Sequence, residues 1–315
     1  MGKHIVVVGS INLDLVAATP HIPIVGETVA GTSFRTFPGG KGANQAVAAA
    51  RLGASVCMIG KLGADSFGTE LRNSLIAANV DTDGVKVVPE SSGVALITTD
   101  PAGQNAITVV AGANAYLSPA DLDANLDLIR DAGMLLTQLE TPLETIEHLA
   151  EIASEHGIPL MLDPAPARAL PPSLLKLIDW LTPNETETCI LIDQPPGELS
   201  LASLEKAAET LLATGCRNVI LKLGHKGCYV ALSDGTRRLV PAYPVKAVDS
   251  TAAGDAFNGA FAVAQINGME PVEAASWASA VAALSVTRAG AQASMPTAME
   301  VDVFLDDIRS AKVGR

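Results

Sequence analysis

The chain has 315 residues and a formal net charge of −13, which excludes the broad basic surface that binds nucleic acids or anionic membranes. Apolar residues make up 48% of the sequence and aromatic residues only 3%, so aliphatic side chains must pack the core of a large α/β domain. The four cysteines lack metal-ligand spacing, which predicts free, mostly buried thiols in a reducing compartment.

Signals for export or membrane insertion are not seen in the sequence. The apolar run at 4–8 is shorter than the core of a signal peptide, and no apolar run reaches membrane-spanning length. We therefore expect a soluble, cytoplasmic protein that contacts neither a membrane nor a nucleic acid.

Helices and strands are predicted along most of the chain from the spacing of apolar residues. Strands are expected at 4–8, 55–60, 134–138, 159–162, 180–182 and 218–222. Helices are expected at 43–52, 65–78, 119–131, 142–156, 172–178, 201–214, 254–267, 272–287 and 301–310. This alternation predicts an α/β fold with a doubly wound, mostly parallel central sheet flanked by helices. Ligands of such sheets bind at the carboxyl ends of the strands.

Two segments interrupt the α/β series. Residues 13–37 are broken by prolines and glycines, and the extended runs at 93–99 and 105–110 have the pattern of a hairpin. No helix is predicted between the two runs, so they do not belong to the parallel series. We predict that 13–37 and about 93–111 form a small β-sheet lid, inserted in a single domain that covers residues 1–315.

The segment Ala252-Ala253-Gly254-Asp255 places small residues and one carboxylate at the start of an apolar helix. The first amides of a helix are unpaired and lie at the positive end of its dipole, so side chains this small let an anion approach closely. In phosphoryl transfer the attacking hydroxyl loses a proton, and a carboxylate such as Asp255 can accept it. The alternative is that Asp255 only caps the helix, and this segment alone leaves both interpretations open.

Two common nucleotide-binding fingerprints are missing from the sequence. Lys41 follows a glycine pair, but Gly42 comes next instead of the Ser or Thr of a P-loop. The first predicted strand is followed by Gly9-Ser10-Ile11-Asn12, which does not contain the GxGxxG pattern. The second absence disfavours a dehydrogenase.

Two motifs resemble signatures of the ribokinase family of carbohydrate kinases. One is Asp249-Ser250-Thr251-Ala252-Ala253-Gly254-Asp255-Ala256-Phe257, and the other is Gly39-Gly40-Lys41-Gly42-Ala43-Asn44-Gln45-Ala46. The resemblance runs from end to end of the chain, with Ser250 and Ala256 as mild departures. It implies an ATP-dependent sugar kinase in which Asp255 is the catalytic base. The amides of Ala252, Ala253, Gly254 and Asp255 would form the anion hole.

Besides Asp255, the resemblance assigns six residues to the sugar: Asn12, Asp14, Gly40, Lys41, Asn44 and Glu140. A carboxylate that accepts from two neighbouring hydroxyls suits a vicinal diol, so Asn12 and Asp14 favour ribose. Taken alone, these two would be turn residues, Lys41 a solvated lysine and Glu140 a helix-entry residue. The implied reaction is phosphorylation of the 5-hydroxyl of D-ribose to D-ribose 5-phosphate, with 2-deoxyribose, fructose or a nucleoside as alternative substrates.

The same resemblance assigns the nucleotide to Asn184, Lys222, Leu223, Gly224, His225, Lys226, Gly227, Gly254 and Ser279. Glu187 would hold Mg²⁺ through water, because this ion keeps much of its hydration. Taken alone, Asn184 and Glu187 would be a helix-capping pair, and the glycine loop would be a tight turn. Family members often carry His where Ser279 stands, so this side chain is not expected to stack on the base.

A potassium site is also implied, formed by Asp249, Thr251, Ser285, Arg288, Gly290 and Ser294. A cation there would order the loop that carries the anion hole. The resemblance further implies a homodimer formed through the lid, whose outer face would carry Val94, Leu96 and Ile107. The alternative from another class is a sugar-binding regulatory protein on the same fold, which would be signalled by loss of Asp255 or Glu187.

Overall fold

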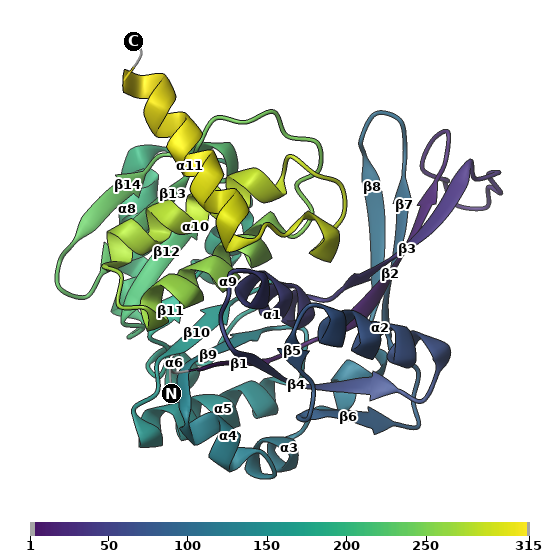
Figure 1. Cartoon of the computed structure of the whole chain (residues 1–315), viewed down its shortest axis with the longest axis horizontal. Coiled ribbons are helices and arrows are strands. Elements are labelled where there is room, and N and C mark those ends of the chain that lie inside the picture. Colours follow the sequence, from purple (N-terminus) through teal and green to yellow (C-terminus); the bar gives the residue numbers. More distant parts are fainter. Residues whose placement is uncertain (1–3, 314–315) are drawn as a thin grey trace.

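The computed structural model describes residues 4–313, which form two sheets flanked by helices (Figure 1). The strands of the large sheet are β1 (His4–Val8), β4 (Val56–Gly63), β5 (Val80–Asp81), β6 (Val85–Val88), β9 (Ala132–Gln138), β10 (Leu160–Asp163), β11 (Trp180–Leu181), β12 (Asn218–Lys222), β13 (Cys228–Leu232) and β14 (Arg237–Val240). Their order is β14-β13-β12-β11-β10-β9-β1-β4-β5, and β6 pairs with β4. Among the described pairs of this sheet, only β12–β13 and β13–β14 are antiparallel. The predicted mostly parallel central sheet is therefore confirmed.

Helices cover both faces of this sheet, and the alternation of side chains along β1 shows which helices lie on which face. Ile5 and Val7 belong to a core shared with α1 (Lys41–Arg51), α2 (Ser66–Ala77), α9 (Ala253–Ile266), α10 (Pro271–Ser285) and α11 (Ala298–Val313). Val6 and Val8 belong to a second core, shared with α3 (Pro119–Asp123), α4 (Leu126–Arg130), α5 (Leu143–His156), α6 (Pro172–Leu175), α7 (Glu185–Leu191) and α8 (Leu201–Ala213). A fully buried strand of this kind contributes apolar side chains to both faces.

The structure differs from the sequence analysis in two places along the chain. No element was predicted at 228–240, where strands β13 and β14 form an antiparallel meander at the sheet edge. The helix expected at 119–131 is divided into α3 and α4. The break lies at Asn125, whose side-chain amide donates to the Asp121 carbonyl at 2.8 Å and so competes with regular helical pairing.

The small sheet has the order β3-β2-β7-β8 and projects from the side of the molecule (Figure 1). Its strands are β2 (Asn12–Ala18), β3 (Ser33–Gly39), β7 (Gly93–Thr99) and β8 (Asn105–Val110). Asn12 and Asp14 are two residues apart on β2, so they share one face with Ala95 and Ile97 of β7. Ile107 pairs with Ile97 and lies on that face too, so the expectation that it shares a face with Val94 and Leu96 is wrong.

Helices α1 and α9 approach each other closely at Gly259. A Cβ atom added there would lie 2.7 Å from the Ala48 Cβ and 2.8 Å from the Gln45 carbonyl oxygen. Only a residue without a side chain therefore allows this spacing. The contact brings the first two turns of α1 beside the first turn of α9.

The cysteines and the lengths of the helices can be compared with the sequence analysis. All four cysteines are free and buried, as predicted. Within residues 4–313, no helix is both long enough and apolar enough to cross a membrane.

We predict that Gly259→Val separates α1 from α9 and lowers the free energy of unfolding by about 3 kcal/mol, the upper end of the usual cost of overpacking. Urea denaturation measures this change. The matched control is Gly197→Val, since a Cβ at Gly197 meets nothing within 4 Å. Equal stability of the two variants would contradict the close packing.

Candidate active site

Asp255 is buried in the first turn of α9, with 5% of its surface exposed. Its Oδ2 accepts a hydrogen bond from Asn44 Nδ2 at 3.0 Å, and its Oδ1 accepts one from Gln45 Nε2 at 3.1 Å. Burial raises the pKa of Asp255 to about 6, although the Lys41 ammonium and the two amide donors oppose that rise. The carboxylate is therefore available near neutral pH but remains more basic than an exposed aspartate.

The first turn of α9 separates two cavities. Thr251, Ala252 and Asp255 line one of them, which we call the small-sheet cavity, with a volume of about 650 Å³. Ser250, Ala253 and Gly254 line the other, which we call the α10 cavity, with a volume of about 360 Å³. Ligands in the two cavities would therefore meet at the positive end of a helix dipole.

The backbone at this helix start is unusual. Ala252, the residue that precedes α9, has a left-handed conformation with φ of 59°. Such a conformation is costly for a residue with a side chain, and it turns successive amides toward one side of the chain. Of these amides, the one of Ala253 donates to the Ser250 carbonyl at 3.2 Å.

The small-sheet cavity contains all six residues that were predicted to contact a sugar: Asn12, Asp14, Gly40, Lys41, Asn44 and Glu140. They come from β2, from the start of α1 and from the loop after β9. These three segments meet at the carboxyl ends of β1 and β9, beside the strand at which the sheet order reverses.

The orientation of the Asn12 side chain is fixed by Asn114, which sequence reasoning did not identify. Asn114 pairs with the backbone of Ile11 in both directions, accepting from its amide at 2.9 Å and donating to its carbonyl at 3.2 Å. This pairing settles which atom of Asn114 is the nitrogen, and that nitrogen donates to Asn12 Oδ1 at 2.7 Å. The free end of Asn12 is therefore its amide donor.

Asp14 and Glu140 are two of the four carboxylates that line the small-sheet cavity, together with Glu187 and Asp255. Burial raises the pKa of Asp14 to about 7, and the nearby carboxylates of Glu140 and Asp255 add to the effect. Gly39 leaves room for this side chain, because a Cβ at Gly39 would lie 2.6 Å from Asp14 Oδ2. Glu140 Oε2 accepts from Ser10 Oγ at 2.5 Å and from the Lys41 amide at 3.2 Å.

Lys41 supplies positive charge to the same cavity. Burial acts to lower its pKa, but the surrounding carboxylates, with Asp255 foremost, outweigh this and raise it. The ammonium group is therefore charged at every physiological pH. It compensates part of the negative charge around Asp255.

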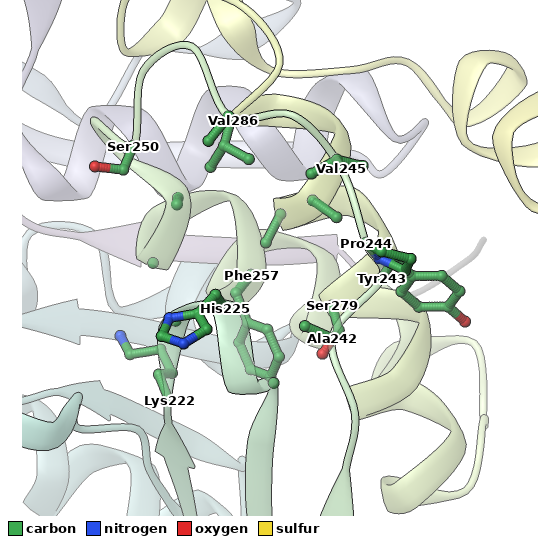
Figure 2. A pocket seen from close by; sticks show the side chains of 17 residues that line it. Lys222, His225, Ala242, Tyr243, Pro244, Val245, Ser250, Phe257, Ser279 and Val286 are labelled. Carbon is green, nitrogen blue, oxygen red and sulfur yellow. The ribbon is translucent and has the colours of Figure 1, made fainter. Parts of the chain in front are cut away.

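The α10 cavity contains six of the residues that were predicted to contact a nucleotide: Lys222, Gly224, His225, Gly227, Gly254 and Ser279. In the view of Figure 2, Lys222 and His225 lie at one end of this cavity and Tyr243 at the other, with Phe257 and Ser279 between them. The Ser279 hydroxyl donates to the Ala275 carbonyl of its own helix at 2.8 Å. Its hydrogen is therefore already used within α10.

Three other predicted nucleotide residues do not line the α10 cavity. Leu223 is a core residue, and the Lys226 ammonium lies 3.3 Å from Glu185 and 3.4 Å from Glu198. Asn184 caps α7, where its amide and side chain bond to Glu187 at 2.7 and 2.8 Å. Glu187 also lines the small-sheet cavity, and its pKa is raised by burial, against the effect of the Lys222 ammonium.

Sequence reasoning missed a buried polar chain behind Asp255. Asp163, the last residue of β10, accepts from Lys222 Nζ at 2.9 Å and from Gln45 Nε2 at 3.0 Å. Gln45 accepts in turn from Gln138 Nε2 at 2.8 Å. The signal for Asp163 was present, since a carboxylate directly after an apolar parallel strand lies at the ligand-binding edge.

The comparisons with known proteins agree with this site. A model of the pfkB family of carbohydrate kinases matches residues 2–298. The chain belongs to this family. The resemblance deduced from the two glycine-containing motifs is thereby confirmed.

Relatives of this carbohydrate kinase include enzymes for two sugars. The chain is 43% identical to a ribokinase of Bacillus subtilis over 304 residues, covering 96% of the chain and 99% of the relative. It is 39% identical to a deoxyribokinase of Salmonella typhimurium over 303 residues, covering 96% and 98%. Among solved structures, Arabidopsis thaliana ribokinase complexed with ribose and ATP superimposes with a TM-score of 0.91 at 34% identity, covering 97% and 99% of the two chains.

The residues predicted to bind potassium lie in the loop before α9 and in the segment that runs from the end of α10 to residue 294, and these two parts of the kinase contact each other. Asp249 Oδ1 accepts from the amide and hydroxyl of Thr251 at 2.9 and 2.6 Å, and its Oδ2 accepts from the Gly290 amide at 2.8 Å. The Ser285 and Ser294 hydroxyls donate to carbonyls within their own turns. The Arg288 guanidinium pairs with Glu300 at 2.6 Å, so only its backbone could face a cation in this loop.

Proposed function

We propose that this kinase transfers the γ-phosphoryl group of ATP to the 5-hydroxyl of D-ribose, giving D-ribose 5-phosphate. The observation that carries the proposal is the first turn of α9, which separates a cavity rich in hydroxyl-binding groups from a second, more apolar cavity. A phosphate bound by the amides of this turn would lie between a sugar and a nucleotide. The similarity to ribokinases over nearly the whole chain supports the same substrates.

The small-sheet cavity supplies complementary partners for the hydroxyls of ribose. Asn12 offers its amide donor and Asp14 its carboxylate acceptor, while Asn44 Oδ1 is buried with no partner within the described chain. Gly40 permits the close approach of α1 to β2, because its φ is 87° and a Cβ there would lie 2.6 Å from the Asn12 nitrogen. Lys41 and Glu140 complete the polar lining.

Asp255 acts as the base for the 5-hydroxyl. Each of its oxygens accepts one amide donor and retains a lone pair, so the carboxylate can still take a proton. The amides of residues 252–255 would receive the charge that develops on the transferring group. The Lys222 ammonium lies close to these amides, since a Cβ at Gly254 would lie 3.3 Å from its Nζ.

The nucleotide occupies the α10 cavity, with the glycine loop 224–227 and Ser279 along its wall. Mg²⁺ is the expected companion of ATP, and Glu187 fits it because this carboxylate lines the small-sheet cavity and carboxylate oxygens suit the ion. Bound there through water, the ion would neutralise charge on the phosphates. Asn184 holds the Glu187 side chain in place through the capping bonds.

A second candidate substrate is 2-deoxyribose, because a deoxyribokinase is 39% identical to this chain. The geometry favours ribose. Asn12 and Asp14 place a donor and an acceptor side by side on one face of β2, which matches a complete vicinal diol. A sugar without the 2-hydroxyl would leave one of these buried groups unpaired, and an unpaired buried polar group costs about 1–3 kcal/mol.

The proposal predicts that the enzyme phosphorylates ribose with a kcat/KM at least about tenfold higher than for 2-deoxyribose, fructose or nucleosides. It also predicts that Asp255→Asn lowers kcat for ribose about 10³-fold, because the base is lost while the shape of the side chain is kept. ADP formation measured over a panel of sugars checks both statements.

The matched control is Asp123→Asn, which changes an aspartate that is 62% exposed on α3. It should keep the wild-type rate. Preference for 2-deoxyribose would reassign the substrate, and near-normal turnover of a folded Asp255→Asn enzyme would remove the base from the mechanism.

We further propose that potassium binds between the loops 249–251 and 285–294 and orders the start of α9. Asp249 supports this, because it already joins the two loops next to Ala252.

Replacing a large organic cation by K⁺ should raise kcat about fivefold or more, as expected for a ligand that orders a distant loop. Asp249→Ala should weaken this response, and equal rates in both buffers would disprove the site.

A homodimer formed through the small sheet also remains our proposal. Leu96 and Val110 are 47% and 45% exposed on one face of the sheet, and Phe34 on the same face is 65% exposed. Burying these side chains against a second copy would remove apolar surface from water.

Light scattering of the wild-type protein should give twice the mass of the chain. Leu96→Lys should lower the measured mass to that of the monomer, whereas the control Ile76→Lys on α2 should leave it unchanged. A wild-type monomer would contradict the interface.

A further inference from the structure

A buried chain of side chains links Asp255 to Lys222 through Gln45. Gln45 has no exposed surface, and its Nε2 donates to two carboxylates, Asp255 Oδ1 at 3.1 Å and Asp163 Oδ2 at 3.0 Å. Asp163 accepts in addition from Lys222 Nζ at 2.9 Å. One amide nitrogen therefore joins the proposed base to the acid–lysine pair on the nucleotide side.

The orientation of this amide is determined by its partners. Two carboxylates can only accept, so the group that faces them must be the nitrogen of Gln45, and its oxygen must face Gln138. Gln138 Nε2 donates to that oxygen at 2.8 Å. Gly9 leaves space for Gln138, because a Cβ at Gly9 would lie 2.1 Å from Gln138 Oε1. Gln45 therefore cannot rotate without leaving buried groups unpaired.

We propose that Gln45 is a positioning residue that holds the carboxylates of Asp255 and Asp163 in one fixed geometry, with Gln138 holding Gln45. This inference rests on the proposed function, since it concerns the base and the phosphate-side lysine of that reaction. A shared donor reduces the repulsion between two buried carboxylates and fixes the orientation of Asp255, which lines the small-sheet cavity. Small errors in such an arrangement cost about 10²-fold in rate.

The charged groups around Asp255 indicate what the loss of Gln45 would change. Lys41 from α1 favours the ionised form of Asp255, whereas Asp163 from β10 and Asp14 from β2 oppose it. The hydrogen bond from Gln45 also stabilises the ionised form of Asp255. Its removal therefore raises the pKa of Asp255 above the value of about 6. Because the base must be ionised, activity would then be lost at a higher pH on the acidic side.

The test is Gln45→Met, which keeps the length of the side chain and removes its three hydrogen bonds, the two donated to Asp255 and Asp163 and the one accepted from Gln138. We expect kcat for ribose to fall about 100-fold, KM for ribose to change less than threefold, and the acidic limb of kcat to move to higher pH. A ¹³C NMR titration of the Asp255 carboxyl, assigned with Asp255→Asn, should show the same upward shift. The matched control is Gln265→Met near the end of α9. It should leave kcat, KM, the acidic limb of kcat and the titration of Asp255 unchanged.

Gln138→Met is the second variant. In it, Gln45 can still donate to Asp255 and Asp163, but it loses the bond from Gln138 that orients its amide. It should lower kcat about tenfold, and it provides the test if Gln45→Met does not fold. A Gln45→Met enzyme with unchanged kcat, or with an unshifted Asp255 titration, would overturn the positioning role. Failure of the proposed function is distinct, because it appears as an inactive wild type, while the NMR titration still decides whether Gln45 positions Asp255.

Discussion

The buried Asp255 carboxylate needs hydrogen-bond donors, and the close packing of α1 against α9 supplies them. Gly259 lets the two helices approach until Asn44 and Gln45 bond to the two oxygens of Asp255. Without these donors, an ionised carboxylate at this depth would be strongly disfavoured. The same contact fixes the start of α1 beside the small-sheet cavity. The geometry of the site therefore depends on a helix contact that involves no ligand.

The charges of the site are arranged around this contact. Asp14, Glu140 and Asp255 influence one another across the small-sheet cavity, and Lys41 lies among them. An acidic cavity of this kind suits a sugar with many hydroxyl donors and repels free phosphate. In the proposed reaction, the anion would be bound by the first turn of α9, which separates the two cavities, and by Lys222, which lines the α10 cavity. The base for the sugar proton would then lie close to, but distinct from, the groups that hold the phosphate.

Much of the fold was predictable, because buried parallel strands and amphipathic helices have strong local patterns. The strands at the centre of the sheet and the helices α1, α5, α8, α9 and α10 lie close to their expected positions. The strands β13 and β14 did not follow the alternation on which the prediction relied. The break at Asn125 depends on one side chain that bonds to its own backbone, which periodicity does not detect. Ile107 was placed on the wrong face because the face of a strand depends on its pairing register.

The sequence by itself determined the start of α9, where small residues and Asp255 occur together within four positions, and its motifs identified the family. Local sequence can specify a helix start because the amides, the dipole and the carboxylate of the first turn all belong to neighbouring residues. Only the tertiary structure showed what surrounds Asp255. Gln45 is 210 residues away from Asp255 and 118 residues away from Asp163, so no local pattern links them. Their contact follows from sheet order and from helix packing, which bring distant segments together only in the folded chain.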